Sequence, residues 1–166
     1  MTKWILRLAA VVVLAAAAVW CWHHLFPGPE QVIRKRLAQL ARSASTETGE
    51  GSIAKAARVQ GLSGYFTPDV EITVDLPGEF SQSIHGTPEL MQLAMAARSM
   101  GRSIKVDLLD VSVDVAPDGL SAVAHMTGQA KISGEQSLQV QELKAHFRKV
   151  QSDWLIDRVE TVKTLR

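Results

Sequence analysis

Few side chains in this sequence have the type and spacing needed for chemistry, and they are scattered. Tyr65 is the only tyrosine, and a phenol beside a carboxylate can stabilise an oxyanion while an acid or base moves a proton. The nearest acids are Asp69 and Asp75, and His85 follows as a further proton-transfer group. Tyr65, Asp75 and His85 are therefore the candidate catalytic residues, although strand alternation places Asp75 on a polar face.

Other reaction centres have no counterpart in the sequence. It contains no glycine-rich phosphate loop, no Ser-His-Asp arrangement and no His/Asp cluster with metal-ligand spacing. The single cysteine, Cys21, excludes an internal disulfide. With 18 basic and 17 acidic side chains, the chain has no electrostatic preference for nucleic acid. We therefore expect no metal, no cofactor and no nucleic-acid partner.

A histidine–carboxylate pair depends on how two strands are paired. A two-residue turn at Ser133-Gly134 would place Ala122 opposite Ala145, Ala124 opposite Leu143, and Leu120 opposite Phe147. In that register His125 faces Glu142, and both lie with His146 on the outer face of the sheet. We interpret His125 and Glu142 as a surface cross-strand pair.

Hydrophobic periodicity predicts three helices. The first carries Ile33, Leu37 and Leu40 on one stripe, and the second begins near Ile53. The third begins at the sequence GTPE, with Thr87 as N-cap and Pro88 at the first helical position.

Strict alternation predicts the strands, because side chains of a half-buried strand point to opposite faces in turn. The first strand is DVEITVDL, and a weaker strand returns over EFSQSIH. After the third helix, long antiparallel strands follow over 104–115, 120–132 and 135–150, with a shorter one over 154–162. Helices first and a strand meander last indicate an α+β fold.

Three segments carry a resemblance to a known superfamily: GYFTPDVEITVDLPG, IHGTPEL and VQSDWLIDRVETV. With the order of elements, they resemble the nuclear transport factor 2-like proteins, which include the SnoaL-like and ketosteroid-isomerase-like groups. The resemblance covers about residues 30 to 166 and implies a domain over residues 27–166. It implies a curved antiparallel sheet wrapped around three helices, the cystatin-like cone fold.

The resemblance also implies an internal cavity. The residues expected to line its ligand pocket are Tyr65, Phe80, Met91, Met95, Met126, Phe147 and Trp154. Members of the superfamily are enzymes, carriers or assembly modules, and the mostly apolar inward set favours non-catalytic binding of an apolar small molecule or a protein partner. One alternative is a lyase, isomerase or hydrolase of the SnoaL-like type, using Tyr65 with Asp69, Asp75 or His85. Another is an assembly component resembling the periplasmic core of type IV secretion. A homodimer would form through the outer sheet face.

The first 26 residues have a different composition from the rest. From Leu8 to Trp22 the chain has no charged residue, and the apolar run approaches the length of a membrane span. Trp4, Trp20 and Trp22 resemble an interfacial aromatic belt, and Arg7 can extend its charge to the interface.

The basic residues before this run predict a cytoplasmic N-terminus. Residues 1–26 are therefore expected to be a single-pass anchor in a bacterial inner membrane, with residues 27–166 in the periplasm or outside the cell. The alternative is a secreted domain released by cleavage at the alanines of residues 15–18.

Overall fold

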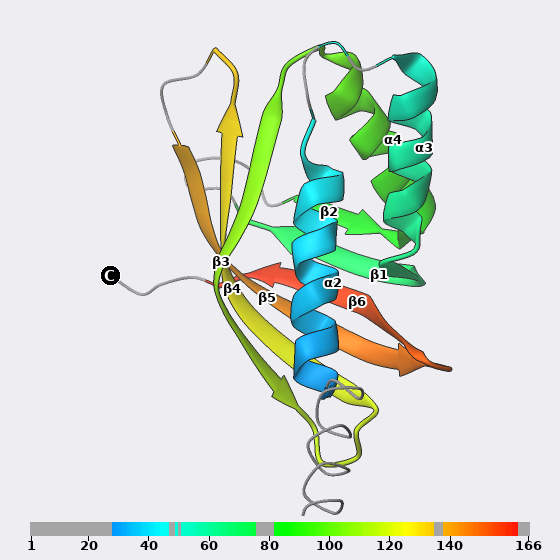
Figure 1. Cartoon of the computed structure of the whole chain (residues 1–166), viewed down its shortest axis with the longest axis vertical. Coiled ribbons are helices and arrows are strands. Elements are labelled where there is room, and N and C mark those ends of the chain that lie inside the picture. The colour runs from blue at the N-terminus through cyan, green and yellow to red at the C-terminus, as the bar shows by residue number, and fades with distance from the viewer. Residues whose placement is uncertain (1–27, 47–48, 50, 76–81, 135–137, 163–166) are drawn as a thin grey trace, which may run out of the picture.

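Three helices and one six-stranded sheet make up the part of the chain that the computed structural model describes, residues 28–46, 49, 51–75, 82–134 and 138–162. Helix α2 crosses the sheet, while α3 and α4 lie side by side near β1 and β2 (Figure 1). In chain order the elements are α2 (Pro29–Ala44), α3 (Ser52–Ser63), β1 (Phe66–Val74), β2 (Gln82–His85), α4 (Gly86–Ser99), β3 (Ile104–Val115), β4 (Ser121–Ile132), β5 (Leu138–Val150) and β6 (Asp153–Thr161).

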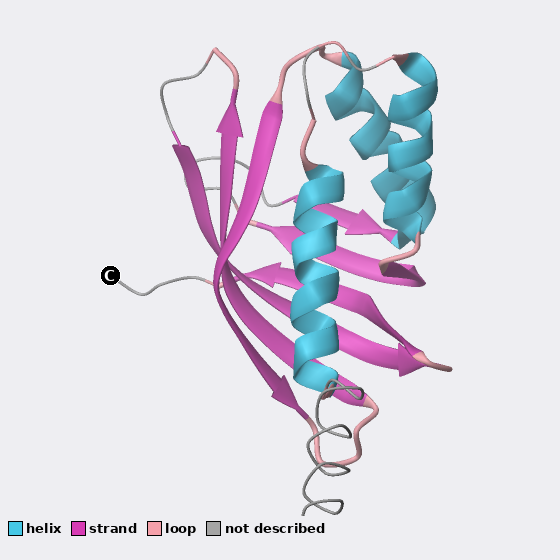
Figure 2. Cartoon of the chain, in the orientation of Figure 1, coloured by secondary structure: helices cyan, strands magenta, loops and turns pink. Residues whose placement is uncertain are grey.

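The predicted α+β class is confirmed, with the helices on one side of a curved sheet (Figure 2). The strand order is β2-β1-β6-β5-β4-β3. The sheet is antiparallel except at one place, where β1 and β6 pair in parallel. Alternation in a sequence reveals which side chains share a face, but it does not reveal which strand becomes the neighbour.

The predicted register of the β4–β5 hairpin is wrong by two residues. Ala122 pairs with Phe147 and Ala124 with Ala145, and the outermost pair is Lys131 with Leu138. The pairing is therefore centred one residue further along the chain than the predicted turn. Because the side-chain period of a strand is two, every residue stays on its predicted face.

The same shift changes the partner of a candidate residue. His125 lies opposite Lys144, whereas the sequence analysis placed it opposite Glu142. The proposed His125–Glu142 pair is therefore wrong, although both side chains are exposed as expected.

The start of α4 also differs from the prediction. The helix begins at Gly86 with His85 as its N-cap residue. Thr87 does not cap the helix; its hydroxyl donates instead to the carbonyl of Thr67, 2.9 Å away. Glu89 accepts a hydrogen bond of 2.7 Å from the backbone N–H of His85. These contacts join α4 to β1 and β2.

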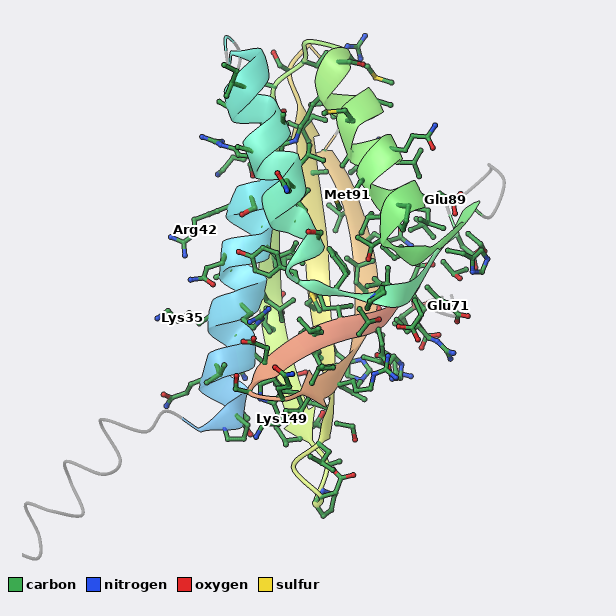
Figure 3. All side chains as sticks on the ribbon, turned by 90° about the vertical axis from the view of Figure 1, so that its right-hand side faces the viewer. Lys35, Arg42, Glu71, Glu89, Met91 and Lys149 are labelled. Atoms are coloured by element: carbon green, nitrogen blue, oxygen red, sulfur yellow. The ribbon has the colours of Figure 1, made fainter. Side chains whose placement is uncertain are left out.

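The core lies between α2 and the sheet. Ile33, Leu37 and Ala41 recur at helical spacing and form the buried stripe of α2. Burying each large apolar side chain contributes roughly 1.5–3 kcal/mol to the free energy of unfolding. Ile33 and Leu37 of this stripe pack in one cluster with sheet residues Val113, Ala122, Ala124, Met126, Ala145, Phe147, Trp154 and Ile156. On the opposite side of α2, Lys35 and Arg42 point away from the sheet (Figure 3).

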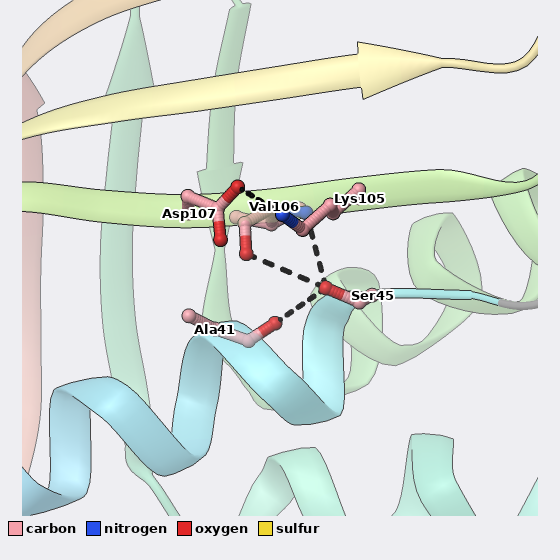
Figure 4. Close-up of polar contacts among 5 residues, drawn as sticks. All are labelled: Ala41, Ser45, Lys105, Val106 and Asp107. Carbon is pink, nitrogen blue, oxygen red and sulfur yellow. Dashed lines mark hydrogen bonds and ion pairs between the residues drawn. The ribbon is translucent and has the colours of Figure 1, made fainter.

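Helix α2 is attached to the edge strand β3 along its length. Arg34 donates to the carbonyl of Val111. At the helix end, the backbone N–H of Val106 donates to Ser45 Oγ at 3.0 Å, and the Ser45 hydroxyl donates to the carbonyl of Ala41 at 2.9 Å (Figure 4). These bonds occupy backbone groups that an edge strand otherwise leaves exposed.

The predicted anchor, residues 1–26, lies outside the described residues. Among the helices that the structure does describe, none combines the length and apolarity that a membrane span requires.

Gly86 is expected to tolerate no side chain, because its φ is +78° and an added Cβ would lie 3.3 Å from the carbonyl oxygen of Pro68. Gly86→Ala should lower the free energy of unfolding by about 1–2 kcal/mol. Gly64→Ala is the matched control, since its Cβ meets only the Gly61 oxygen at 3.6 Å and its φ is −70°. Urea denaturation followed by circular dichroism measures both. Equal stability of the two variants would contradict the expectation.

Candidate functional site

The candidate site is an apolar cavity between α2 and the sheet, which we call the sheet chamber. Its volume is about 220 Å³. Every described residue that lines it has an apolar side chain, so it offers neither a hydrogen-bond donor nor an acceptor from a side chain. These residues are Leu37, Leu40, Ala41, Ala44, Phe66, Ile72, Val106, Leu108, Met126, Leu143, Ala145, Ile156 and Val159.

A second cavity lies beside the first, between α2 and the α3–α4 pair, and we call it the helix chamber. Its volume is about 310 Å³. Leu40, Ala44 and Phe66 line both chambers. Ligand pockets in proteins span about 300–1,000 Å³, so the helix chamber lies at the lower end of this range and the sheet chamber below it.

The seven residues predicted to line a pocket have different positions. Met126 is buried and lines the sheet chamber. Phe147 and Trp154 are buried in the core cluster, and neither is among the described residues that line the two chambers. Met91 is half-buried on α4, whereas Met95 is 45% exposed. Phe80 lies outside the described residues.

Tyr65, the seventh of these residues, belongs to a polar cluster at the junction of α3 and β1. The guanidinium of Arg36 lies over its ring, 5.6 Å from the ring centre. Arg36 also donates to the carbonyl of Gly64 at 2.7 Å and to the Asp153 carboxylate at 3.1 Å. The cluster joins α2 to this junction and to the start of β6.

The candidate catalytic residues do not converge. Tyr65 precedes β1 and Asp75 follows it, and a strand of nine residues separates its ends by about 30 Å. The backbone of Asp75 is bound by Thr161 and Gln141. His85 is exposed on β2, opposite Glu71. A single substrate cannot therefore contact both Tyr65 and Asp75.

The charged side chains of the sheet gather on its outer face, away from α2. Arg148 pairs with Asp69 at 3.1 Å and Arg158 with Glu71 at 3.2 Å. Figure 3 shows Glu71 on the side of the sheet opposite to α2. Asp69, a candidate acid, is thus engaged outside the cavity. These pairs could not be predicted from the sequence, because it does not reveal that β6 lies beside β1 with β5 as the next strand.

Glu160 lies at the centre of a second outer group. Its carboxylate is 3.0 Å from Lys144 Nζ and 3.5 Å from His146 Nε2. The hydrogen bond from Lys144 lowers the pKa of Glu160 below its usual 4.5, and His146 lowers it further against the opposing effect of burial. This pair of histidine and carboxylate points away from both chambers.

Solved structures share this arrangement of elements. An NTF2-like protein of unknown function from Pseudomonas putida superposes with a TM-score of 0.63 at 12% identity, over 82% of this chain and 87% of that chain. An NTF2-like protein with a cystatin-like fold from Novosphingobium aromaticivorans superposes with a TM-score of 0.58 at 18% identity, over 89% of this chain and 86% of that chain. The chain has the nuclear transport factor 2-like cone fold.

A third similar structure carries a suggested activity. A putative scytalone dehydratase from Novosphingobium aromaticivorans superposes with a TM-score of 0.57 at 12% identity, over 81% of this chain and 83% of that chain. No protein-family model matches the sequence, and no curated protein does either. At these identities the likeness extends to the fold and not to the activity.

Loss of the Glu160 carboxylate should weaken the fold near neutral pH but not in acid. Because its pKa is lower in the folded chain, its contribution is present above about pH 4.5 and disappears as the pH falls through the lower folded value. Glu160→Gln should therefore cost a few tenths to about 1 kcal/mol at neutral pH, and this difference should shrink towards zero in acid.

Urea denaturation across this pH range measures the effect. Asp114→Asn is the control, since Asp114 is exposed on the edge strand β3, which does not adjoin β6. A loss of stability in Glu160→Gln that stays constant down to strongly acidic pH would contradict the expectation.

Proposed function

We propose that this domain binds an apolar small molecule in the two chambers beneath α2 and does not transform it. The observation that supports this proposal most directly is the lining of the sheet chamber, in which every described residue is apolar. Transferring the apolar surface of a ligand from water to such a lining favours binding by about 25 cal/mol for each Å² that is buried. Proton transfer would need an acid or base within hydrogen-bond reach of the ligand.

Positions of the acid–base candidates also support binding over catalysis. Tyr65 lies against Arg36, and the Asp69 and Glu160 carboxylates lie on the outer face. A dehydratase, as suggested for one protein of this fold, would need such groups at the chamber. The charged groups of the sheet are thus separated from the place where a ligand would lie.

We also propose that residues 1–26 hold the domain at the outer face of a bacterial inner membrane. The support comes from the sequence, in which Leu8 to Trp22 lacks charge and Lys3 and Arg7 precede it. Helix α2 begins at Pro29, so a spanning segment would join the domain through a very short linker.

The binding proposal predicts that filling the chambers displaces the ligand. Ala44 lines both chambers, so Ala44→Leu should reduce the amount of retained apolar ligand at least tenfold. Ala38→Leu is the matched control, since Ala38 lies on the exposed face of the same helix. Native mass spectrometry of the full chain, purified from its source, measures the ligand. Retention of no small molecule by the unmodified chain would contradict the proposal.

The anchor proposal predicts that the full chain stays with the membrane during alkaline carbonate extraction. Deletion of residues 2–26 should release the domain, because the apolar run is then gone. N-terminal sequencing of the extracted protein provides the second measurement. A mature chain that begins near Val19 would contradict the anchor and indicate a cleaved signal peptide.

A further inference from the structure

Helix α2 begins at the end of the domain where the β3–β4 turn lies. Arg34, in the second turn of the helix, donates to the carbonyl of Val111, and the end of the helix is joined to the start of β3. From the Arg34–Val111 contact, α2 continues for about 7.5 Å to Pro29, whereas β3 continues for about 13 Å to Val115. The β3–β4 turn therefore extends beyond the start of the helix (Figure 1).

Apolar side chains are exposed at this end of the domain, which we call the turn end and define as residues 116–120 and 150–152. Leu120 is 58% exposed and Val150 is 41% exposed. They belong to neighbouring segments, because the backbone N–H of Lys149 donates to the carbonyl of Leu120 at 2.8 Å. Figure 3 shows Lys149 at the same end of the molecule as the start of α2. The turn end therefore presents apolar surface beside the start of this helix.

The chain before α2 leaves little room between the domain and a membrane. Only Pro27 and Gly28 separate Phe26 from Pro29, at which the helix begins. An extended chain advances about 3.3–3.6 Å per residue, so Pro29 lies within about 11 Å of an apolar span that ends at Phe26. The headgroup layer of one leaflet is itself about 5–8 Å thick. With residues 1–26 as the anchor, the start of α2 lies at or just outside the headgroups.

From this position we propose that the turn end rests on the lipid surface, with Leu120 and Val150 inserted among the headgroups. The β3–β4 turn extends past the start of α2 (Figure 1), so it meets the lipid before the helix does. Exposed apolar side chains gain by leaving water for this interface. The inference rests on the proposed anchor and adds the surface by which the domain contacts the membrane.

Charged side chains near the turn end are balanced in sign. Glu30 and Asp118 are exposed, as are Arg34 and Lys149, and the Asp118 carboxylate accepts a hydrogen bond of 2.9 Å from the N–H of Leu120. Attraction to anionic lipids needs an excess of lysine and arginine. The contact is therefore apolar in origin, and we expect it on zwitterionic phosphatidylcholine.

The test measures the surroundings of a nitroxide label at the turn end and at the opposite end of the sheet. Cys21→Ala removes the only native thiol, and Leu120→Cys or Leu138→Cys then carries the label. Leu138 is the matched control, because it is 50% exposed and pairs with Lys131 at the far end of the β4–β5 ladder. Each full-length variant is placed in phosphatidylcholine nanodiscs. Electron paramagnetic resonance measures how accessible the label is to oxygen, which concentrates in lipid, and to a water-soluble nickel chelate.

The label at position 120 should be several-fold less accessible to the nickel chelate than the label at position 138, and more accessible to oxygen. The reason is that interfacial apolar side chains lie about 5–10 Å into the boundary between headgroups and acyl chains. Equal accessibility of the two labels would overturn the lipid contact and leave the anchor standing. Protection from both reagents at position 120 would also overturn it and indicate a protein partner. A chain that separates from the nanodiscs would overturn the anchor itself.

A second pair of positions makes the test independent of a single variant. Val150→Cys at the turn end and Val140→Cys near the opposite end should repeat the difference, since the two valines are 41% and 51% exposed. Circular dichroism establishes that each variant is folded. If Leu120→Cys does not fold, the valine pair decides.

Discussion

Helix α2 is attached to the edge strand β3 by Arg34 near its start and by Ser45 and Thr46 at its end. An edge strand exposes backbone groups that must find partners or water. Here Thr46 exchanges backbone hydrogen bonds with Ile104 at 2.7 and 3.2 Å, and Val106 and Val111 bond to side chains of the same segment. The attachment fixes the distance between α2 and the sheet. That distance determines how large the side chains between them must be to fill the core.

At this distance, the size of each α2 side chain that faces the sheet decides whether the space between helix and sheet is filled. Ile33 and Leu37 reach the sheet and are fully buried. Further along, Ala41 and Ala44 on the helix face Ala145 across the gap, and they leave the sheet chamber. Gly128 makes room for the side chain of Leu143, which lines the chamber, because a Cβ on Gly128 would lie 2.8 Å from Leu143 Cδ1. The cavity is thus a consequence of small residues at a fixed separation.

Alternation and periodicity were sufficient to predict the elements and their faces, but not their neighbours. The hairpin prediction placed Ala124 and His125 on the correct faces despite a register error of two, since face depends only on whether the shift is even. The parallel β1–β6 pair could not be predicted, because it joins segments far apart in the chain. Thr87 was assigned to a local cap, but its hydroxyl bonds to Thr67 on β1.

The candidate site was predictable only in part, for the same reason. Met126 was expected in the cavity because it points inward on a strand, and it does line the sheet chamber. Arg98 of the helix chamber was missed, because an arginine in a helical pattern is usually solvated, whereas here it is buried and bonds to the carbonyl of Ser43 near the end of α2. Tyr65 was selected by residue type, yet its ring lies against Arg36. Residue type identified chemical capacity, whereas tertiary contacts determined which groups meet.

The separation of charge between the two faces of the sheet limits what the interior can do. Strand alternation sends Glu71, Lys144 and Glu160 outward, so any charged group inside must come from a helix or a loop. Among the described residues that line the chambers, only Arg98 on α4 is charged. A guanidinium holds its proton too tightly to act as a general acid near neutral pH and has no lone pair to act as a base. The one charged side chain among the described residues of the chambers is therefore unsuited to moving the protons of a ligand.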